Sequence, residues 1–245
     1  MRTITAVAAL LLGTTAAIAA APAVSPAISR ALTNPARADQ AADDARRDAA
    51  AVLAFSGVKP GWSVVDYIPA SGYWTRIFTG IVGPAGHVYG IWPQAMGGHG
   101  ADGAAKLTAR GLTNVTAEVQ ATDLPTVPAP VDLFWTVQNY HDIANIDGEA
   151  GMAAFNKAVF AALKPGGTYL VIDHAAAAGS GLRDAKTLHR IDPAAAKAEI
   201  VKAGFTFEGE LPALRNPADD HSKKVFDPAI RGHTDQFAYK FVKPR

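Results

Sequence analysis

The stretch that decides the fold is Val64–Thr75, which reads V-V-D-Y-I-P-A-S-G-Y-W-T. Apolar residues lead into an acid, Asp66, and a turn-forming segment with a single glycine, Gly72, then leads into a helical pattern. The spacing predicts a short buried strand over residues 62–67 and a helix over residues 72–81. A strand, a tight loop and a helix in this order begin a βαβ unit.

Outward from this stretch, strands and helices alternate along the chain. Further strands are expected at residues 87–92, 115–120, 131–137, 168–173, 205–210 and 236–242, helices at 39–55, 104–109, 149–163 and 193–203, and a glycine-rich loop at 97–103. This alternation predicts an α/β, doubly wound, Rossmann-like sheet with ligands at the carboxyl ends of its strands. Because no helix separates the last two strands, we expect them to be antiparallel neighbours. The sequence thus predicts a seven-stranded sheet, mostly parallel, with an antiparallel C-terminal strand.

Composition and charge limit the kinds of partner. The chain has 245 residues, of which 49% are hydrophobic and 18% charged, as in a globular protein with a sizeable core. Its formal net charge is +1 and it has no Lys/Arg-rich run, so we expect no nucleic-acid partner. A small-molecule substrate is expected instead, and no sequence feature indicates an oligomeric state.

The N-terminus differs in composition from the rest of the chain. Arg2 precedes an uncharged, Ala/Leu-rich stretch, which predicts a secretory signal peptide over residues 1–21 and export to the periplasm, with no stable membrane insertion after cleavage. The alternative is a membrane anchor, because the stretch approaches the roughly 20 residues that span a bilayer. Residues 22–38 are rich in Pro and Ser and predict a flexible linker before a folded domain over residues 39–245. The chain has no cysteine, so it has no lipid-attachment cysteine and no disulfide.

Several motifs further along the chain carry a resemblance to a known family. They are N-Y-H-D at residues 139–142, L-K-P-G-G-T-Y-L-V-I-D-H at 163–174, L-H-R-I-D at 188–192, D-D-H at 219–221 and T-D-Q-F at 234–237. Together with Val64–Thr75 they make residues 46–244 resemble the class I S-adenosylmethionine-dependent methyltransferases, most of all an exported group of such proteins. The resemblance implies methyl transfer from S-adenosylmethionine to a small-molecule acceptor.

The resemblance also implies a cofactor site around the first two strands. Its residues would be Asp66, Ala70, Gly72, Tyr73, Trp92, Asp123 and Asn139, with the Trp92 ring stacked on adenine. The family loop usually reads D-x-G-x-G-x-G, because glycine lets the backbone approach the methionine part of the cofactor. This chain departs from the pattern at Ile68 and Ala70, and a positive φ at Ile68 would be strained. It also lacks the acid that normally follows the second strand, where residues 90–94 read G-I-W-P-Q.

Polar residues are expected to gather at the ligand-binding edge of the sheet, because parallel strands all end there. Five histidines and several acids follow strand ends: His141, His174, His189, His221, His233, Asp142, Asp173, Asp192, Asp219, Asp220 and Asp235. His141 is the candidate general base, since imidazole titrates near neutral pH. Asn139 and Tyr140 resemble, loosely, the acceptor-orienting segment of amine methyltransferases. His174 and His189 are candidates for a second base or an orienting partner.

Each of these residues also has a structural interpretation. A single His or Asp at a strand end is more often a cap or a loop hydrogen bond, and Asp192 before Pro193 is typical of a helix N-cap. Asp219 and Asp220 are also compatible with a solvated turn. Two further functions stay open beside methyl transfer. One is a divalent metal site built from the His and Asp residues. The other is a non-catalytic, Rossmann-like binding protein.

Overall fold

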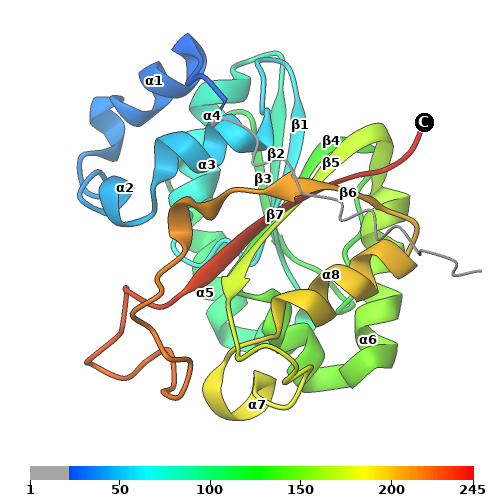
Figure 1. Ribbon diagram of the computed structural model, residues 1–245. Coiled ribbons are helices and arrows are strands. Elements are labelled where there is room, and N and C mark those ends of the chain that lie inside the picture. Colours follow the sequence, from blue (N-terminus) through cyan, green and yellow to red (C-terminus); the bar gives the residue numbers. More distant parts are fainter. Residues whose placement is uncertain (1–21) are drawn as a thin grey trace, which may run out of the picture.

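A seven-stranded sheet organises the protein, whose residues 22–245 are described by a computed structural model (Figure 1). Its order is β3-β2-β1-β4-β5-β7-β6, formed by β1 (Ser63–Tyr67), β2 (His87–Trp92), β3 (Val115–Val119), β4 (Val131–Val137), β5 (Leu163–His174), β6 (Thr206–Glu210) and β7 (Gln236–Val242). Strands β1 to β5 pair in parallel, and β7 is antiparallel to both β5 and β6. The predicted fold, a mostly parallel α/β sheet with an antiparallel C-terminal strand, is confirmed.

Helices cover both faces of the sheet. They are α1 (Pro26–Leu32), α2 (Asp43–Arg46), α3 (Ala49–Ser56), α4 (Tyr73–Val82), α5 (Gly97–Thr108), α6 (Tyr140–Ala162), α7 (Ala185–Leu188) and α8 (Pro193–Lys202), with short 3-10 turns η1 (Pro35–Arg37), η2 (Gln94–Met96) and η3 (Pro212–Leu214). One apolar core contains side chains of α1, α3 and α4, and the other contains side chains of α6 and α8. Val64 of β1 faces the first core and Val65 faces the second. Successive strand residues point to opposite faces, so a sheet covered on both sides has nearly continuous apolar strands.

The glycine-rich segment 97–103, which the sequence predicts to be a loop, instead forms the first part of α5. Its glycines leave room for Trp92. A Cβ on Gly103 would lie 2.7 Å from the Trp92 ring, and a Cβ on Gly100 would lie 3.0 Å from the Trp92 Cβ. Burial of this large ring beneath the helix outweighs the low helix propensity of glycine. The loop prediction was wrong because propensity is local, whereas this packing joins a helix to a strand.

Helix α6 begins at Tyr140, although the sequence predicts its start at Glu149. Gly148 interrupts it with a left-handed φ of +59°, so the predicted segment corresponds to the second part of the helix. The motif N-Y-H-D therefore contributes the first turn of α6, with Asn139 at the N-cap. This turn directly follows β4 and lies at the ligand-binding edge of the sheet.

The segment 22–38, which the sequence predicts to be a flexible linker, contains α1 and η1 and packs on the domain (Figure 1). Ser25 caps α1 by accepting a hydrogen bond from the backbone N–H of Ile28 at 3.3 Å. Ile28 and Ala31 are buried, and a Cβ on Gly80 of α4 would lie 3.1 Å from the Ala31 Cβ. The linker prediction was wrong because a short helix with small apolar residues is stabilised by the surface that it covers.

The helix predicted over residues 39–55 is divided into α2 and α3. Asp48, with a left-handed φ of +44°, separates them. The predicted signal peptide, residues 1–21, lies outside the described residues. From residue 22 onward, no helix combines the length and the hydropathy needed to cross a membrane.

A buried ion pair anchors the long loop between β6 and β7. The guanidinium of Arg190 donates to both carboxylate oxygens of Asp219, at 3.1 and 2.8 Å, and to the carbonyl oxygens of Ala175 and Lys223. Asp219 is therefore buried and does not belong to a solvated turn. The predicted N-cap is confirmed, because the Asp192 carboxylate accepts the N–H of Ala194 at 2.8 Å at the start of α8.

Replacing Arg190 is expected to destabilise the fold. The Arg190→Met variant leaves the Asp219 carboxylate buried without its counter-ion, so its free energy of unfolding should fall by about 3–5 kcal/mol in urea denaturation. The matched control is Arg183→Met, because Arg183 pairs with Asp184 but is 70% exposed. Its free energy of unfolding should stay close to that of the wild type, because solvent screens an exposed ion pair. Equal losses in the two variants would contradict an anchoring role for the buried pair.

Candidate functional site

The loop between β1 and α4 has backbone conformations that favour glycine at three positions. Ile68, Ala70 and Gly72 have φ angles of +55°, +52° and +79°. The backbone N–H of Ile68 donates to the carbonyl of Ile91 on β2 at 2.8 Å, which holds the first of these residues in place. Left-handed φ values disfavour side chains with a Cβ, and a β-branched residue most of all. The loop therefore keeps its conformation despite two unfavourable side chains.

Asp66 is a buried acid next to the last residue of β1. Its Oδ2 accepts a hydrogen bond from the Thr75 hydroxyl of α4 at 2.6 Å, which ties the strand to the helix across the loop. Burial raises the pKa of Asp66 to about 7, against the opposing effect of the Thr75 hydrogen bonds. A carboxyl group that can be neutral or charged near neutral pH thus lies at the base of the loop.

Two neighbouring cavities lie at the carboxyl ends of β1 and β4. The larger, about 270 Å³, is lined by Tyr67, Ile68, Pro93, Ala95, Met96, Asp123, Leu124, Asn139, Asp142, Ile143, Ile146, Asp147, Gly151 and Phe155. The smaller, about 150 Å³, is lined by Arg47, Asp66, Ile68, Pro69, Ala70, Ser71, Tyr73, Trp74, Val137, Gln138 and Asn139. Ile68 and Asn139 line both cavities and mark the boundary between them. This is the edge of the sheet at which the sequence predicts ligand binding.

Most of the residues expected to bind a cofactor line these cavities. Asp66, Ala70 and Tyr73 line the smaller one, Asp123 the larger one and Asn139 both. Gly72 is the N-cap of α4, where a Cβ would lie 2.4 Å from the Leu107 side chain.

Trp92, the expected adenine-stacking residue, has a different environment. Its side chain is 1% exposed and packs beneath the glycines of α5. It lines neither cavity. The side chains that follow it, Pro93, Ala95 and Met96, line the larger cavity in its place.

Arg47 lines the smaller cavity, and the sequence offers no signal for it. Its guanidinium lies 4.5 Å from the centroid of the Tyr73 ring. Within residues 22–245, its buried Nε has no hydrogen-bond partner. A cationic group with an unused donor, beside a buried acid, can bind a zwitterionic ligand. Arg47 stands next to another arginine in a charged, Ala-rich segment, so only the folded chain distinguishes it from Arg46.

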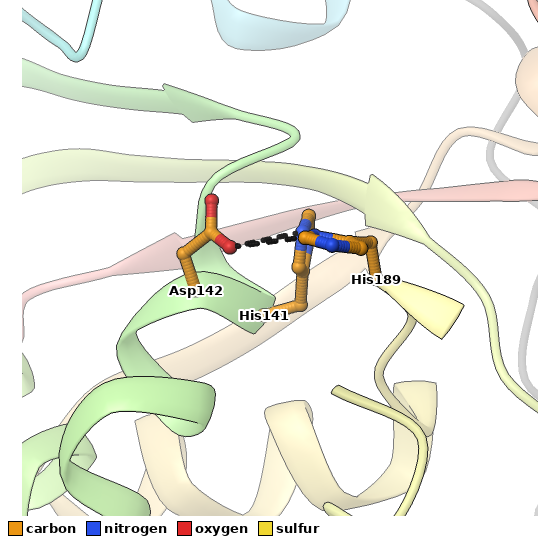
Figure 2. A group of neighbouring side chains, drawn as sticks. All are labelled: His141, Asp142 and His189. Carbon is orange, nitrogen blue, oxygen red and sulfur yellow. Dashed lines mark ion pairs between the residues drawn. The ribbon is translucent and has the colours of Figure 1, made fainter. Parts of the chain in front are cut away.

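The histidine cluster forms around the first turn of α6, which follows Asn139. The Asp173 carboxylate accepts the backbone N–H of His141 at 2.7 Å and lies 2.8 Å from its ring Nδ1. Figure 2 shows the Asp142 carboxylate directed toward the His141 and His189 rings. Its Oδ1 lies 3.4 Å from Nε2 of His141 and 3.7 Å from Nδ1 of His189. Burial disfavours the charged form of His141, but the Asp173 carboxylate outweighs this and raises the pKa of the imidazole.

Other candidates lie behind or outside this cluster. His174 contacts the Thr234 hydroxyl through Nδ1 at 2.8 Å, and burial lowers the pKa of its imidazole to about 4. Tyr140 is fully buried, and its hydroxyl accepts a hydrogen bond from the Asn156 amide at 2.7 Å, so it faces the core. His221 pairs with Asp235 at 3.0 Å, and His233 lines a separate hollow.

The raised pKa of Asp66 predicts a pH dependence of stability. Between its ordinary value of 3.8 and about 7, the native state holds a proton that the unfolded chain has lost. The resulting stabilisation is complete below pH 3.8 and is lost as the pH rises through about 7. Asp66→Asn cannot ionise, so its unfolding free energy relative to the wild type should rise by on the order of 2 kcal/mol between about pH 5 and about pH 8. Urea unfolding at the two pH values measures this, and a constant difference would contradict it.

Comparisons with known proteins identify the fold by its similarity to solved structures. No family model and no curated protein matches the sequence. Among solved structures, a SAM-dependent methyltransferase from Aquifex aeolicus is 16% identical, with a TM-score of 0.56, over 88% of this chain and 97% of that one. A putative sarcosine dimethylglycine methyltransferase from Galdieria sulphuraria is 14% identical, with a TM-score of 0.59, over 84% and 88%. The [4+2]-cyclase SpnF is 17% identical, also with a TM-score of 0.59, over 84% and 82%. At these identities the likeness shows the fold alone, which is that of S-adenosylmethionine-dependent methyltransferases.

Proposed function

We propose that the protein transfers a methyl group from S-adenosylmethionine to a small-molecule acceptor. The observation that carries the proposal is the β1–α4 loop, whose residues 68, 70 and 72 keep glycine-like conformations beside two adjoining cavities. When bound, S-adenosylmethionine supplies the sulfonium methyl group that is transferred. Export to the periplasm is part of the proposal and rests on the composition of residues 1–21.

The residues of the smaller cavity fit the amino-acid part of this cofactor. Arg47, whose buried Nε lacks a partner within the described part of the chain, would pair with the carboxylate. Asp66 would accept hydrogen bonds from the ammonium group, which favours its charged form. The backbone of Ala70 and Ser71 borders the same space.

The larger cavity fits a nucleoside. Its lining is mainly apolar, with Met96 and Ile143 among the residues that would contact a base. Asp123 is its polar contribution from the loop before β4, and its Oδ1 accepts the N–H of Ala95 at 2.7 Å. The amide nitrogen of Asn139 donates to the carbonyl of Tyr67 at 3.1 Å, which fixes this side chain where the two cavities meet.

The acceptor is proposed to enter on the side of the histidine cluster. Asp142 lines the larger cavity and also contacts His141 and His189, so the cluster borders the ligand space. Its imidazole and carboxylate groups can remove a proton from an acceptor directly, or hold a metal ion that lowers the pKa of the acceptor.

A second candidate function is ligand binding without methyl transfer. Two observations favour it. The bulky side chain of Ile68 borders both cavities, and no carboxylate follows β2 at residues 93 and 94 to hold ribose hydroxyls. Such a protein would accept another small ligand at the same edge of the sheet.

Calorimetric titration with S-adenosylmethionine and S-adenosylhomocysteine tests the proposal. The wild type is expected to bind both, and Arg47→Met should bind roughly 10-fold to 100-fold more weakly because a charge-assisted hydrogen bond to the carboxylate is lost. The control is Arg46→Met, since Arg46 is exposed and pairs with Asp43. Its affinity should stay within about twofold of the wild type. Absence of binding by the wild type at millimolar concentrations would reject methyl transfer and favour the second function.

Two substitutions of Ile68 separate strain from obstruction. Ile68→Ala removes the bulk that borders both cavities, whereas Ile68→Gly also removes the penalty of a left-handed φ. Both variants should bind S-adenosylmethionine more tightly, and Ile68→Gly should be about 1 kcal/mol more stable than Ile68→Ala. Calorimetry and urea unfolding measure the two effects. Weaker binding by both variants would mean that the Ile68 side chain packs against the cofactor.

A further inference from the structure

Three side chains, of which Asp142 lines the larger cavity, present metal-ligating atoms to one another (Figure 2). They are Nε2 of His141, a carboxylate oxygen of Asp142 and Nδ1 of His189, all within 4.8 Å of one another. Asp142 Oδ1 lies 3.4 Å from the His141 nitrogen and 3.7 Å from the His189 nitrogen. Ligands of a tetrahedral Zn²⁺ at about 2.0–2.1 Å are separated by roughly 3.3 Å, so a small movement of the half-buried Asp142 and His189 side chains completes the geometry.

We propose that His141, Asp142 and His189 bind a divalent transition-metal ion, with Zn²⁺ as the preferred ion. Imidazole nitrogens and one carboxylate suit zinc and its neighbours in the first transition series, and the chain has no cysteine to favour softer metals. Three protein ligands leave one position open for water or substrate, as in catalytic zinc sites.

The surroundings of His141 orient it as a ligand. Asp173 is fully buried, and its Oδ1 lies 2.8 Å from Nδ1 of His141. Because a carboxylate can only accept, Nδ1–H donates to it, and Nε2, which lies 3.4 Å from Asp142, is the nitrogen available to a metal ion. A carboxylate that holds the far nitrogen of a histidine is the usual support of a metal-bound imidazole. The backbone N–H of His141 also donates to Asp173, at 2.7 Å, so the residue is held at two points.

His189 is held in position by different means. It has a left-handed φ of +56° at the end of α7, a conformation that is sparsely populated and that recurs at functional sites. Its ring packs on Phe226, with the centroids 5.0 Å apart. The next residue, Arg190, is fixed by its buried pair with Asp219. The backbone thus presents the imidazole to Asp142 from a different segment of the chain.

The site is buried on one side and open on the other. The side chain of His141 is 4% exposed, whereas those of Asp142 and His189 are 40% and 32% exposed. Asp142 also lines the larger cavity, so an ion held by its carboxylate would border the ligand space. If the proposed methyl transfer holds, an acceptor hydroxyl bound there would lose its proton to solvent more readily, because the ion lowers its pKa. In that case His141 acts as a metal ligand and not as a free base.

The test uses untagged, full-length protein freed of metal with a chelator and then dialysed. Titration of this metal-free protein with Co²⁺, monitored by visible absorption, should show one site per chain. Added Zn²⁺ should displace the Co²⁺. After dialysis of the zinc-loaded protein, elemental analysis should find one Zn²⁺ per chain. His189→Ala and Asp142→Asn each remove a half-buried ligand that lies outside the apolar core and should keep the fold, as circular dichroism can verify. Each should weaken Zn²⁺ binding by about 100-fold. Asp173→Asn keeps all three ligands but weakens the support of His141 and removes the charge that accepts the His174 backbone N–H, and it should weaken binding by about 10-fold to 100-fold.

The matched control is His221→Ala, which breaks another His–Asp pair, His221 with Asp235. Its zinc affinity should equal that of the wild type. Substoichiometric zinc in the wild type, or equal losses in the control and in His189→Ala, would overturn the proposal. Binding of S-adenosylmethionine is measured separately on the metal-free protein, so that failure of the metal site and failure of the proposed methyl transfer give different results.

Discussion

The carboxylate of Asp173, fully buried at the end of β5, is the group on which the candidate site depends. Burying an ion costs several kcal/mol, and here the backbone N–H groups of His141 and His174, together with the His141 ring, offset that cost. Burial opposes its charge, but the charge and hydrogen bonds of His141 outweigh it and lower the pKa of Asp173. These bonds join the end of β5 to the first turn of α6. They thereby set the positions of Asn139 and Asp142 at the two cavities.

The β1–α4 loop is the second constraint. Left-handed conformations at Ile68 and Ala70 are unfavourable alone, and they persist because the surrounding structure determines them. The pairing of Ile68 with β2 and the bond between Asp66 and Thr75 both act on this loop. Backbone strain of this kind, here beside two cavities, recurs at ligand-binding and catalytic sites. That combination supports a binding role at this edge.

The order of strands and helices could be predicted from the sequence because it depends on local patterns. Apolar runs of strand length, turn residues and the Asp192–Pro193 cap each act within a few residues, and the structure agrees with them. The candidates Asp66, Ala70, Tyr73, Asp123 and Asn139 followed from the family resemblance of the sequence motifs, and in the structure they line the cavities at the edge where the parallel strands end. His141 and His189 come together on the same principle.

Other features depended on contacts between distant segments. Helix α5 forms over a glycine-rich segment because its glycines accommodate the Trp92 ring, and the same packing buries Trp92 away from the cavities. Segment 22–38 becomes ordered because α1 covers α4. Arg47 reaches the smaller cavity because the chain turns at Asp48, and the hydrophobic periodicity of the sequence does not predict this turn. The sequence by itself determined the fold and the edge at which ligands bind, since hydrophobic periodicity and turn chemistry are local. Only the tertiary structure decided which side chains border the cavities and which face the core, because burial, hydrogen bonds and ion pairs form when distant segments of the chain meet.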